Sequence, residues 1–438
     1  MKRGRIVLQV ATAAAAISLV FGAGAGYAPD AHAASDSFYT YSGSAPLDSI
    51  APGTVLQTRT IPYHMVGIPL PITAVQLQYR TNDAQERPTA NITTVLLPPG
   101  GVDPAKAVAY QSYYDSLNPE DGPSRSAAGV VSLGDSVLSA ESPQIVPLLA
   151  QGYTVIIADT EGQTADFAAG PEYGMATLDS IRAATHSPEV GLNEQTRIAL
   201  MGYSGGAIAT NWAAALAPAY APEVNSQLVG AAEGGLLVNP ARNLKYLDGS
   251  FGWAGVAAMA IIGVGRSYGI DFSPYLNDYG QQIVNRMDQV SIANVLFQYP
   301  GLTWPQLVKP QYADPRDVPP FVEAVRKVNL GRAATPTIPM FIGQGANGVL
   351  EGTDGSKPSI GAGDGVMIAG DVRGLANQYC ADGATVQYTQ YDALSHIPSL
   401  LLTWTPQALQ WINERFAGVP AADTCGAIAP GNSLIPEM

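Results

Sequence analysis

The chain has 438 residues, of which 47% are hydrophobic and only 13% are charged. Its 36 acidic residues outnumber its 22 basic residues, so the net charge is −14. This balance excludes a typical nucleic-acid-binding protein, which needs a basic surface. The high apolar content argues against a disordered chain. The length allows two or three domains, or one large α/β domain that carries an insertion.

The first 33 residues have the features of a signal peptide. Lys2, Arg3 and Arg5 form a basic start, residues 6–26 are apolar and small, and Ala31-His32-Ala33 offers a cleavage site. The alternative is a membrane anchor, because the apolar stretch is nearly long enough to span a bilayer. No later stretch reaches that length. We therefore expect cleavage near Ala33 and a soluble protein secreted to the extracellular space or the cell envelope.

Short apolar strands and helices alternate along most of the chain. Residues 153–158 form a continuous apolar run, which is typical of a buried parallel strand. Residues 73–80 instead alternate between apolar and polar types, as in a half-exposed strand. The alternation favours an α/β fold with a mostly parallel central sheet that is covered on both faces. The other expected strands are residues 92–97, 107–112, 197–201, 228–232, 339–342 and 385–391, and helices are expected over 145–150, 175–184 and 204–216.

Residues 240–335 interrupt this alternation. The segment contains twelve aromatic residues, and residues 253–265 are apolar on all sides. Thirteen residues are too few to span a bilayer, so this stretch is expected to be a buried or pocket-lining helix. We interpret the segment as a helical cap or lid inserted into a core made of residues 34–239 and 336–438. The alternative is an ordinary set of core helices.

Cys380 and Cys425 are the only two cysteines. In an oxidising compartment a single pair of cysteines usually forms a disulfide, which here would tie the C-terminal tail to the core. Two free thiols are the alternative. Neither cysteine has a second Cys or a His at the spacing of metal ligands, so no metal site is predicted.

Gly202-Tyr203-Ser204-Gly205-Gly206 matches the pattern G-x-S-x-G and lies between a predicted strand and a predicted helix. This context predicts a nucleophile elbow, in which a tight turn holds the serine in a strained conformation. Gly202 and Gly206 would omit side chains that clash across the turn. The helix that follows would direct its free N–H groups toward the reacting oxygen.

A serine nucleophile requires a base, and in folds with this turn the acid and then the histidine follow the serine in the chain. His396 is the only histidine after Ser204, so it is the candidate base by elimination; His64 and His186 are interpreted as structural. The acid must lie between residues 342 and 396. We favour Asp364, which ends a long Gly-rich loop, with Asp354 next. The full candidate set is Glu351, Asp354, Asp364, Asp371, Asp382 and Asp392.

The oxyanion of such a reaction needs two N–H donors. Gly205 follows the nucleophile and would supply one, and the loop after the third strand would supply the other. That loop contains Tyr113-Tyr114-Asp115-Ser116. Only the backbone N–H of Asp115 need point inward, and its carboxylate could brace the loop. A plain turn or capping role for Asp115 is the alternative.

Several segments together resemble the secretory lipase family, a branch of the α/β-hydrolases typified by fungal lipase A. The resemblance covers nearly the whole chain after residue 33. It implies an α/β-hydrolase fold with a cap between the sixth and seventh strands and a late disulfide. It also implies Ser204, Asp364 and His396 as the catalytic triad, with Asp115 and Gly205 as oxyanion donors. The segments are TAVQLQYRTND, SYYDSLNPEDGPS, QGYTVIIADTEG, ATLDSIRAA, GYSGGA, AAEGG and DGVMIAGDVRGLANQYCADGA.

These observations predict a secreted serine hydrolase that cleaves carboxylic esters of lipids, such as a triacylglycerol lipase or esterase. No cofactor and no nucleic-acid partner are implied. The acidic chain would contact lipid surfaces only transiently, through apolar groups. An acyltransferase would use the same triad, and a peptidase is allowed by the same fold. A non-catalytic lipid-binding protein is the alternative from a different class.

Overall fold

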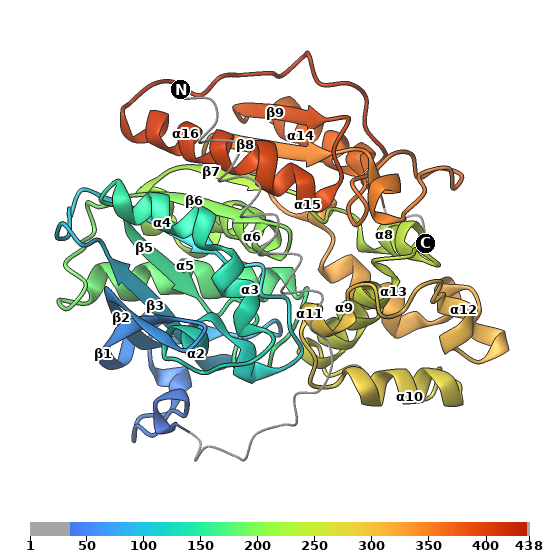
Figure 1. The fold of residues 1–438 in the computed structure, drawn as a ribbon, viewed down its shortest axis with the longest axis horizontal. Coiled ribbons are helices and arrows are strands. Elements are labelled where there is room, and N and C mark those ends of the chain that lie inside the picture. The colour runs from blue at the N-terminus through green and yellow to red at the C-terminus, as the bar shows by residue number, and fades with distance from the viewer. Residues whose placement is uncertain (1–35, 436–438) are drawn as a thin grey trace, which may run out of the picture.

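A computed structural model describes residues 36–435, so the predicted signal peptide lies outside the described part of the chain. Nine strands form one sheet in the order β1-β2-β3-β5-β4-β6-β7-β8-β9. The strands from β5 to β9 in this order are parallel, and β1 to β3 form an antiparallel edge (Figure 1). The bounds are β1 (Val55–Met65), β2 (Ile68–Asn82), β3 (Pro88–Leu97), β4 (Lys106–Gln111), β5 (Thr154–Ala158), β6 (Arg197–Tyr203), β7 (Leu228–Gly234), β8 (Met340–Gly345) and β9 (Val386–Tyr391).

Helices cover both faces of this sheet, as the alternation predicts (Figure 1). One face packs into a core with α5 (Gly170–His186), α6 (Gly205–Tyr220) and α14 (Ala369–Ala381). The other face packs against a second set of helices. The predicted helix over 175–184 is longer than expected and is buried along almost its whole length as α5. The second set comprises α2 (Pro123–Ala127), α3 (Asp135–Ala140), α4 (Ser142–Ala150) and α16 (Thr405–Phe416).

The expectation of a half-exposed strand over residues 73–80 is wrong. Strand β2 is buried from residue 74 to residue 81, including its polar positions. Gln76 donates to the carbonyl of Ser124 at 2.6 Å, and Gln78 donates to the carbonyl of Phe38 at 2.9 Å. The N-terminal segment and α2 therefore cover the face that the pattern assigned to solvent. The alternation reflects two different buried faces rather than one face in water.

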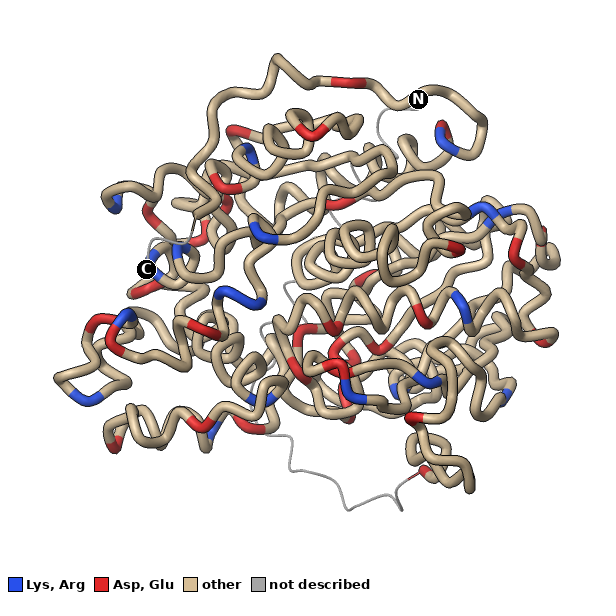
Figure 2. Tube along the Cα trace, turned by 180° about the vertical axis from the view of Figure 1, so that it is seen from behind, with Lys and Arg blue, Asp and Glu red and all other residues tan. Residues whose placement is uncertain are grey.

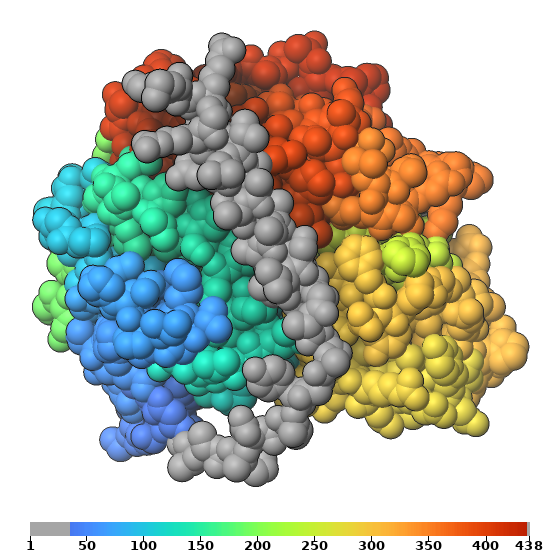
Figure 3. Space-filling view, in the orientation of Figure 1, coloured from blue at the N-terminus to red at the C-terminus, as the bar shows by residue number. Residues whose placement is uncertain are grey.

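The segment between β7 and β8 is helical and forms a lobe at one side of the sheet, seen in yellow in Figure 3. The apolar stretch over 253–265 is found as helix α9 (Ala254–Ser267). This helix lies at the centre of a hydrophobic cluster that also includes side chains of the sheet domain. We refer to residues 240–335 as the helical insertion. Its other helices are α8 (Pro240–Leu247), α10 (Asp278–Met287), α11 (Ile292–Val295), α12 (Trp304–Leu307) and α13 (Pro319–Lys327).

The predicted disulfide is present between Cys380 and Cys425 and connects the end of α14 to the tail that follows α16. Charged residues are sparse along the chain trace (Figure 2). Several carboxyl groups are nevertheless buried inside the sheet domain, where serine side chains and N–H groups bind them: Asp121, Asp159, Glu161 and Glu141. None of the helices within residues 36–435 is both long and apolar enough to cross a membrane.

Candidate active site

Ser204 occupies the turn between β6 and α6 with φ 55° and ψ −121°. A positive φ is costly for a residue with a Cβ and persists only where the surroundings impose it. Here the backbone N–H of Ser204 donates to the carbonyl of Gly234 on the adjacent strand β7 at 2.9 Å. The side chain lies at the N-terminus of a sixteen-residue helix, and the residue keeps only 9% of its surface exposed.

The glycines around Ser204 allow β6 and α6 to pack at backbone distance. A Cβ on Gly202 would lie 2.2 Å from the carbonyl oxygen of Gly206. A Cβ on Gly206 would lie 2.1 Å from the carbonyl oxygen of Gln111 at the end of β4. Gly205 has no room for a side chain either, because its Cβ would lie 1.7 Å from Oδ1 of Asp115. The turn therefore requires glycine at positions 202 and 206, whereas a side chain at position 205 would displace the carboxyl group of Asp115.

His396 is the first residue of α15 (His396–Ser399), directly after the loop that follows β9. Its Nδ1 is hydrogen-bonded to Oδ2 of Asp364 at 2.7 Å, and its backbone N–H donates to the carbonyl of Asp364 at 2.7 Å. The other oxygen, Oδ1, accepts the N–H groups of Val366 and Met367, and Oδ2 also accepts the Gln344 amide. Asp364 is thus fully buried with both oxygens occupied, and its carboxylate orients the His396 ring.

The other acid candidates lie elsewhere or bind other groups. Asp354 is exposed and hydrogen-bonds only to Ser356. Asp371 forms a buried ion pair with Arg242 at 2.5 Å. Asp382 and Asp392 bind side chains at the surface. Among the described candidates, Asp364 alone has a carboxylate hydrogen-bonded to the His396 ring, a distinction that depends on tertiary contacts.

Two aromatic rings hold the imidazole of His396 from different sides. Tyr203 lies 5.0 Å from it, centroid to centroid, and donates its hydroxyl to the His396 carbonyl at 2.8 Å. Trp253, from the start of the helical insertion, meets the ring edge-on at 5.3 Å. A Cβ on Gly235 would lie 2.5 Å from Cε1 of His396, which places the ring beside the β7 end that binds the Ser204 N–H.

Glu351 was one of the acid candidates and has a contact that the sequence does not indicate. Its Oε2 accepts the indole N–H of Trp253 at 2.9 Å, and its Oε1 accepts the backbone N–H of Ile397 at 2.9 Å. The buried carboxyl therefore links the helical insertion to the residue that follows His396. Trp253 and Glu351 are 98 residues apart, so spacing alone could not pair them.

Burial alone lowers the pKa of His396, but the nearby carboxylate of Asp364, with smaller contributions from Glu351 and Asp115, raises it above its ordinary value. Burial raises the pKa of Glu351, against the opposing effects of His396 and the Ile397 N–H. Burial also raises the pKa of Asp115 to about 8, although His396 and the Asp115 backbone N–H oppose this shift. The site thus favours a positive imidazolium while disfavouring a charge on Asp115.

Asp115 lies in the loop after β4 with φ 36°, next to Gly205. Its carbonyl accepts the N–H of Ile292 at the start of α11, so this loop is fastened to the helical insertion. Its carboxyl group packs directly on the backbone of Gly205. The two residues proposed as oxyanion donors are therefore in contact, at the N-terminus of α6.

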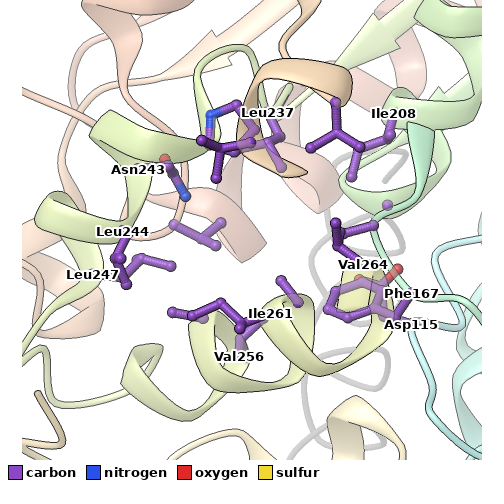
Figure 4. A pocket seen from close by; sticks show the side chains of 18 of the residues that line it. Asp115, Phe167, Ile208, Leu237, Asn243, Leu244, Leu247, Val256, Ile261 and Val264 are labelled. Carbon is purple, nitrogen blue, oxygen red and sulfur yellow. The ribbon is translucent and has the colours of Figure 1, made fainter. Parts of the chain in front are cut away.

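An apolar cavity of about 850 Å³, which is partly open to solvent, begins at Ser204, Gly205 and Asp115. Figure 4 shows Asp115 and Phe167 at one side and Leu244 and Leu247 at the opposite side, with α9 running between them. Both the sheet domain and the helical insertion contribute walls. A second apolar cavity on the other side of α9 shares Ile261 and Phe272 with the first.

The two other histidines within residues 36–435 have partners outside this arrangement. His64 contacts the carbonyl of Ala127 at 3.0 Å, and His186 is exposed next to Glu194. Within residues 36–435, no cluster of three or more His, Cys, Asp or Glu side chains could hold a metal ion.

The chain belongs to the secretory lipase family, whose model matches residues 131–424. It is 31% identical over 380 residues to a probable inactive lipase of Mycobacterium tuberculosis, covering 85% of this chain and 80% of that protein. It is 30% identical over 407 residues to lipase 2 of Candida albicans, covering 90% and 83% of the two chains.

Solved structures agree with this assignment. Candida antarctica lipase A in its closed state superposes with a TM-score of 0.78 at 29% identity, covering 92% of this chain and 90% of that one. The rice cell wall degrading esterase LipA of Xanthomonas oryzae has a TM-score of 0.61 at 15% identity, covering 84% and 100%, and shares the fold. The α/β-hydrolase fold is therefore confirmed, and the family supports a hydrolase of lipid esters. The family's secretory character and the disulfide also point to an extracellular protein.

Proposed function

We propose that the protein is a secreted serine hydrolase that cleaves carboxylic esters of lipids through an acyl-enzyme. The observation that carries this proposal is that three features occur together at one site. Ser204 is held at positive φ at a helix N-terminus, the buried His396–Asp364 pair packs against Gly235 next to the strand end that accepts the Ser204 N–H, and an apolar cavity begins at the serine. In this proposal the signal peptide comprises residues 1–33, and residues 240–335 act as the cap that buries the acyl chain.

The proposed reaction has two halves. Ser204 Oγ attacks the ester carbonyl while His396 Nε2 takes its proton, and the oxyanion accepts the N–H groups of Gly205 and Asp115. The imidazolium then protonates the departing alcohol, which leaves the acyl group on Ser204. A water molecule gives a proton to His396 as it attacks the acyl-enzyme. The imidazolium then returns a proton to Ser204 Oγ as the ester bond to the serine breaks and the fatty acid leaves. Asp364 stabilises the imidazolium in both halves.

The cavity supports a substrate with a long apolar acyl chain. Its walls are almost entirely aliphatic and aromatic, apart from Ser204 and Asp115 at one end and Asn243 on α8. Burying each methylene of an acyl chain in such a wall contributes about 0.8 kcal/mol. Medium- and long-chain esters should therefore react with higher kcat/KM than acetate.

The test is hydrolysis of p-nitrophenyl esters from acetate to palmitate by the protein without residues 1–33, beside Ser204→Ala. We expect activity that peaks at medium or long chains and falls by at least about 10⁴-fold in the variant. One relative is named a probable inactive lipase, so a result without activity is also informative. Activity that survives in Ser204→Ala would show that Ser204 is not the nucleophile. Absence of hydrolysis would favour an acyltransferase or a lipid-binding protein. An assay of acyl transfer to an added alcohol would distinguish these two.

A further inference from the structure

Asn243 is a polar residue in a part of the cavity that is otherwise apolar. It lies on α8 and lines the cavity with its neighbours Leu244 and Leu247. Apart from Ser204 and Asp115 at the reacting end, and Trp253, whose N–H binds Glu351, the described lining consists of apolar side chains and glycine. Asn243 therefore stands apart from the chemistry of its surroundings.

The helical periodicity emphasises this position. Residues 240, 243, 244 and 247 of α8 all line the cavity, which is the i, i+3, i+4, i+7 pattern of one helix face. An aliphatic residue would complete that face. Asparagine has a lower helix propensity than leucine and gains nothing from an apolar wall. Its presence on this face needs a polar partner.

Asn243 keeps only 8% of its surface exposed, and its side-chain amide forms no hydrogen bond with another described residue. The backbone of Asn243 is satisfied, because its N–H donates to the carbonyl of Asn239 at 2.9 Å. In Figure 4 the amide nitrogen of Asn243 points toward the space between the labelled leucines. Because Asn243 lines the cavity, its amide offers two N–H donors and one acceptor oxygen to an occupant.

We propose that Asn243 recognises an oxygen atom along the acyl chain, so that the preferred substrates are esters of hydroxylated or keto fatty acids. This inference rests on the proposed function, since it assumes that the acyl chain occupies the cavity that begins at Ser204. A hydroxyl group can both donate to the amide oxygen and accept from the amide nitrogen, whereas a keto group can only accept. A plain methylene leaves the amide unpaired, and sites built to bind a polar group discriminate against analogues that lack it.

The experiment compares kcat/KM for p-nitrophenyl octadecanoate with a series of its hydroxylated counterparts, each with the hydroxyl at a different carbon, and with the matching keto esters. We expect one hydroxyl position to react at least about fivefold better than the plain chain. In Asn243→Leu this preference should disappear, so that the ratio of kcat/KM for the oxygenated ester over the plain ester falls to about one. Leu247→Ala is the matched control on the same helix face and should keep the preference for the oxygenated chain.

Equal kcat/KM for plain and oxygenated chains at every position would overturn the inference, as expected if a water molecule satisfies the amide. An unchanged preference in Asn243→Leu would overturn it too. If Asn243→Leu fails to fold, the series on the wild-type protein and on Asn243→Ser still decides the question. A wild-type protein without Ser204-dependent hydrolysis of any ester would refute the proposed function instead, which separates the two failures.

Discussion

On the sheet side of the cavity, close backbone packing and buried polar groups hold atoms in place, whereas on the side of the helical insertion small apolar side chains leave space. Gly202 and Gly206 lie in close contact with neighbouring backbone, and both oxygens of Asp364 are hydrogen-bonded. Helix α9 instead presents alanines and branched residues to cavities on two sides. The comparison indicates that the sheet domain supplies geometry and the insertion supplies volume.

Among the polar contacts that join the two regions, two involve residues of the proposed site. Glu351 binds Trp253 of the insertion, and the carbonyl of Asp115 accepts the N–H of Ile292. Both contacts lie next to the proposed catalytic groups. A change on the sheet side should therefore affect the hydrolysis of all substrates alike, whereas a change in the insertion should alter selectivity among acyl chains. A change at the Glu351–Trp253 contact, which we call the junction, should affect the proposed base His396.

The largest expected effect comes from Asp364→Asn. An asparagine at this position would favour the wrong tautomer of His396 and could not stabilise the imidazolium, so kcat should fall by about 10⁴-fold. The loss should be equal for short and long p-nitrophenyl esters, because the change leaves the cavity intact. A loss confined to one chain length would contradict the division between geometry and volume. Asp354→Asn, which alters an exposed carboxylate in the same loop, is the control.

Removal of the disulfide by Cys380→Ser with Cys425→Ser should lower stability without changing chain-length selectivity. The bridge closes a loop with a sequence separation of 45, for which the chain-entropy model predicts about 4 kcal/mol in the free energy of unfolding. Urea unfolding of the oxidised protein and of the double variant measures the difference. An unchanged midpoint would show that the tail contributes nothing to the sheet domain.

The buried carboxyls of the sheet domain predict lower stability at alkaline pH. Burial raises the pKa of Glu233 to about 8, as it does for Asp115. Such groups favour the folded state fully below their unfolded pKa of about 4, and this contribution is lost as the pH rises through about 8. The melting temperature should therefore fall by several degrees between pH 5 and pH 8.5, and Glu233→Gln should reduce that fall. A melting temperature that is flat or rising over this range would contradict the assignment.

Glu351→Gln tests the contact through which Glu351 joins the sheet domain to Trp253 of the insertion. The carboxylate faces His396 together with Asp364 and Asp115, so removing its charge should lower the pKa of His396. We expect about a tenfold loss of kcat/KM and a shift of the acid limb of the pH–rate profile to lower pH by about half a unit. KM for short esters should not change, because Glu351 does not line the cavity. An acid limb that stays in place would show that Glu351 affects only stability.

The smallest effect is expected from Phe272→Ala in the insertion. Phe272 borders both apolar cavities, so its removal should connect them and lengthen the path for an acyl chain. The ratio of kcat/KM for palmitate over butyrate should rise by about fivefold, with little change for butyrate itself. Tyr275 lines only the second cavity, so Tyr275→Ala is the matched control. Equal changes for both esters would mean that the acyl chain does not reach Phe272.

Much of this protein follows from local sequence patterns. The strand, the Gly202–Gly206 motif and the helix that follows are adjacent in the chain, so the strained turn at Ser204 could be predicted from spacing. The prediction of His396 as the candidate base came from elimination among four histidines. The inserted helix over 253–265 followed from its length and apolar character. These features depend on neighbours in sequence, for which periodicity and turn chemistry are sufficient.

Other features were decided only by tertiary structure. Six acids competed for the place beside His396, and only the packing of the loop after β8 against α15 brings Asp364 to the ring. Strand β2 has a pattern typical of a half-exposed strand but is buried on both faces, because Phe38 and α2 cover it. The Glu351–Trp253 contact joins residues 98 positions apart, and only the fold places Asn243 on the wall of the cavity that begins at Ser204. Sequence patterns report which face of an element is apolar, whereas the identity of what covers that face depends on the whole fold.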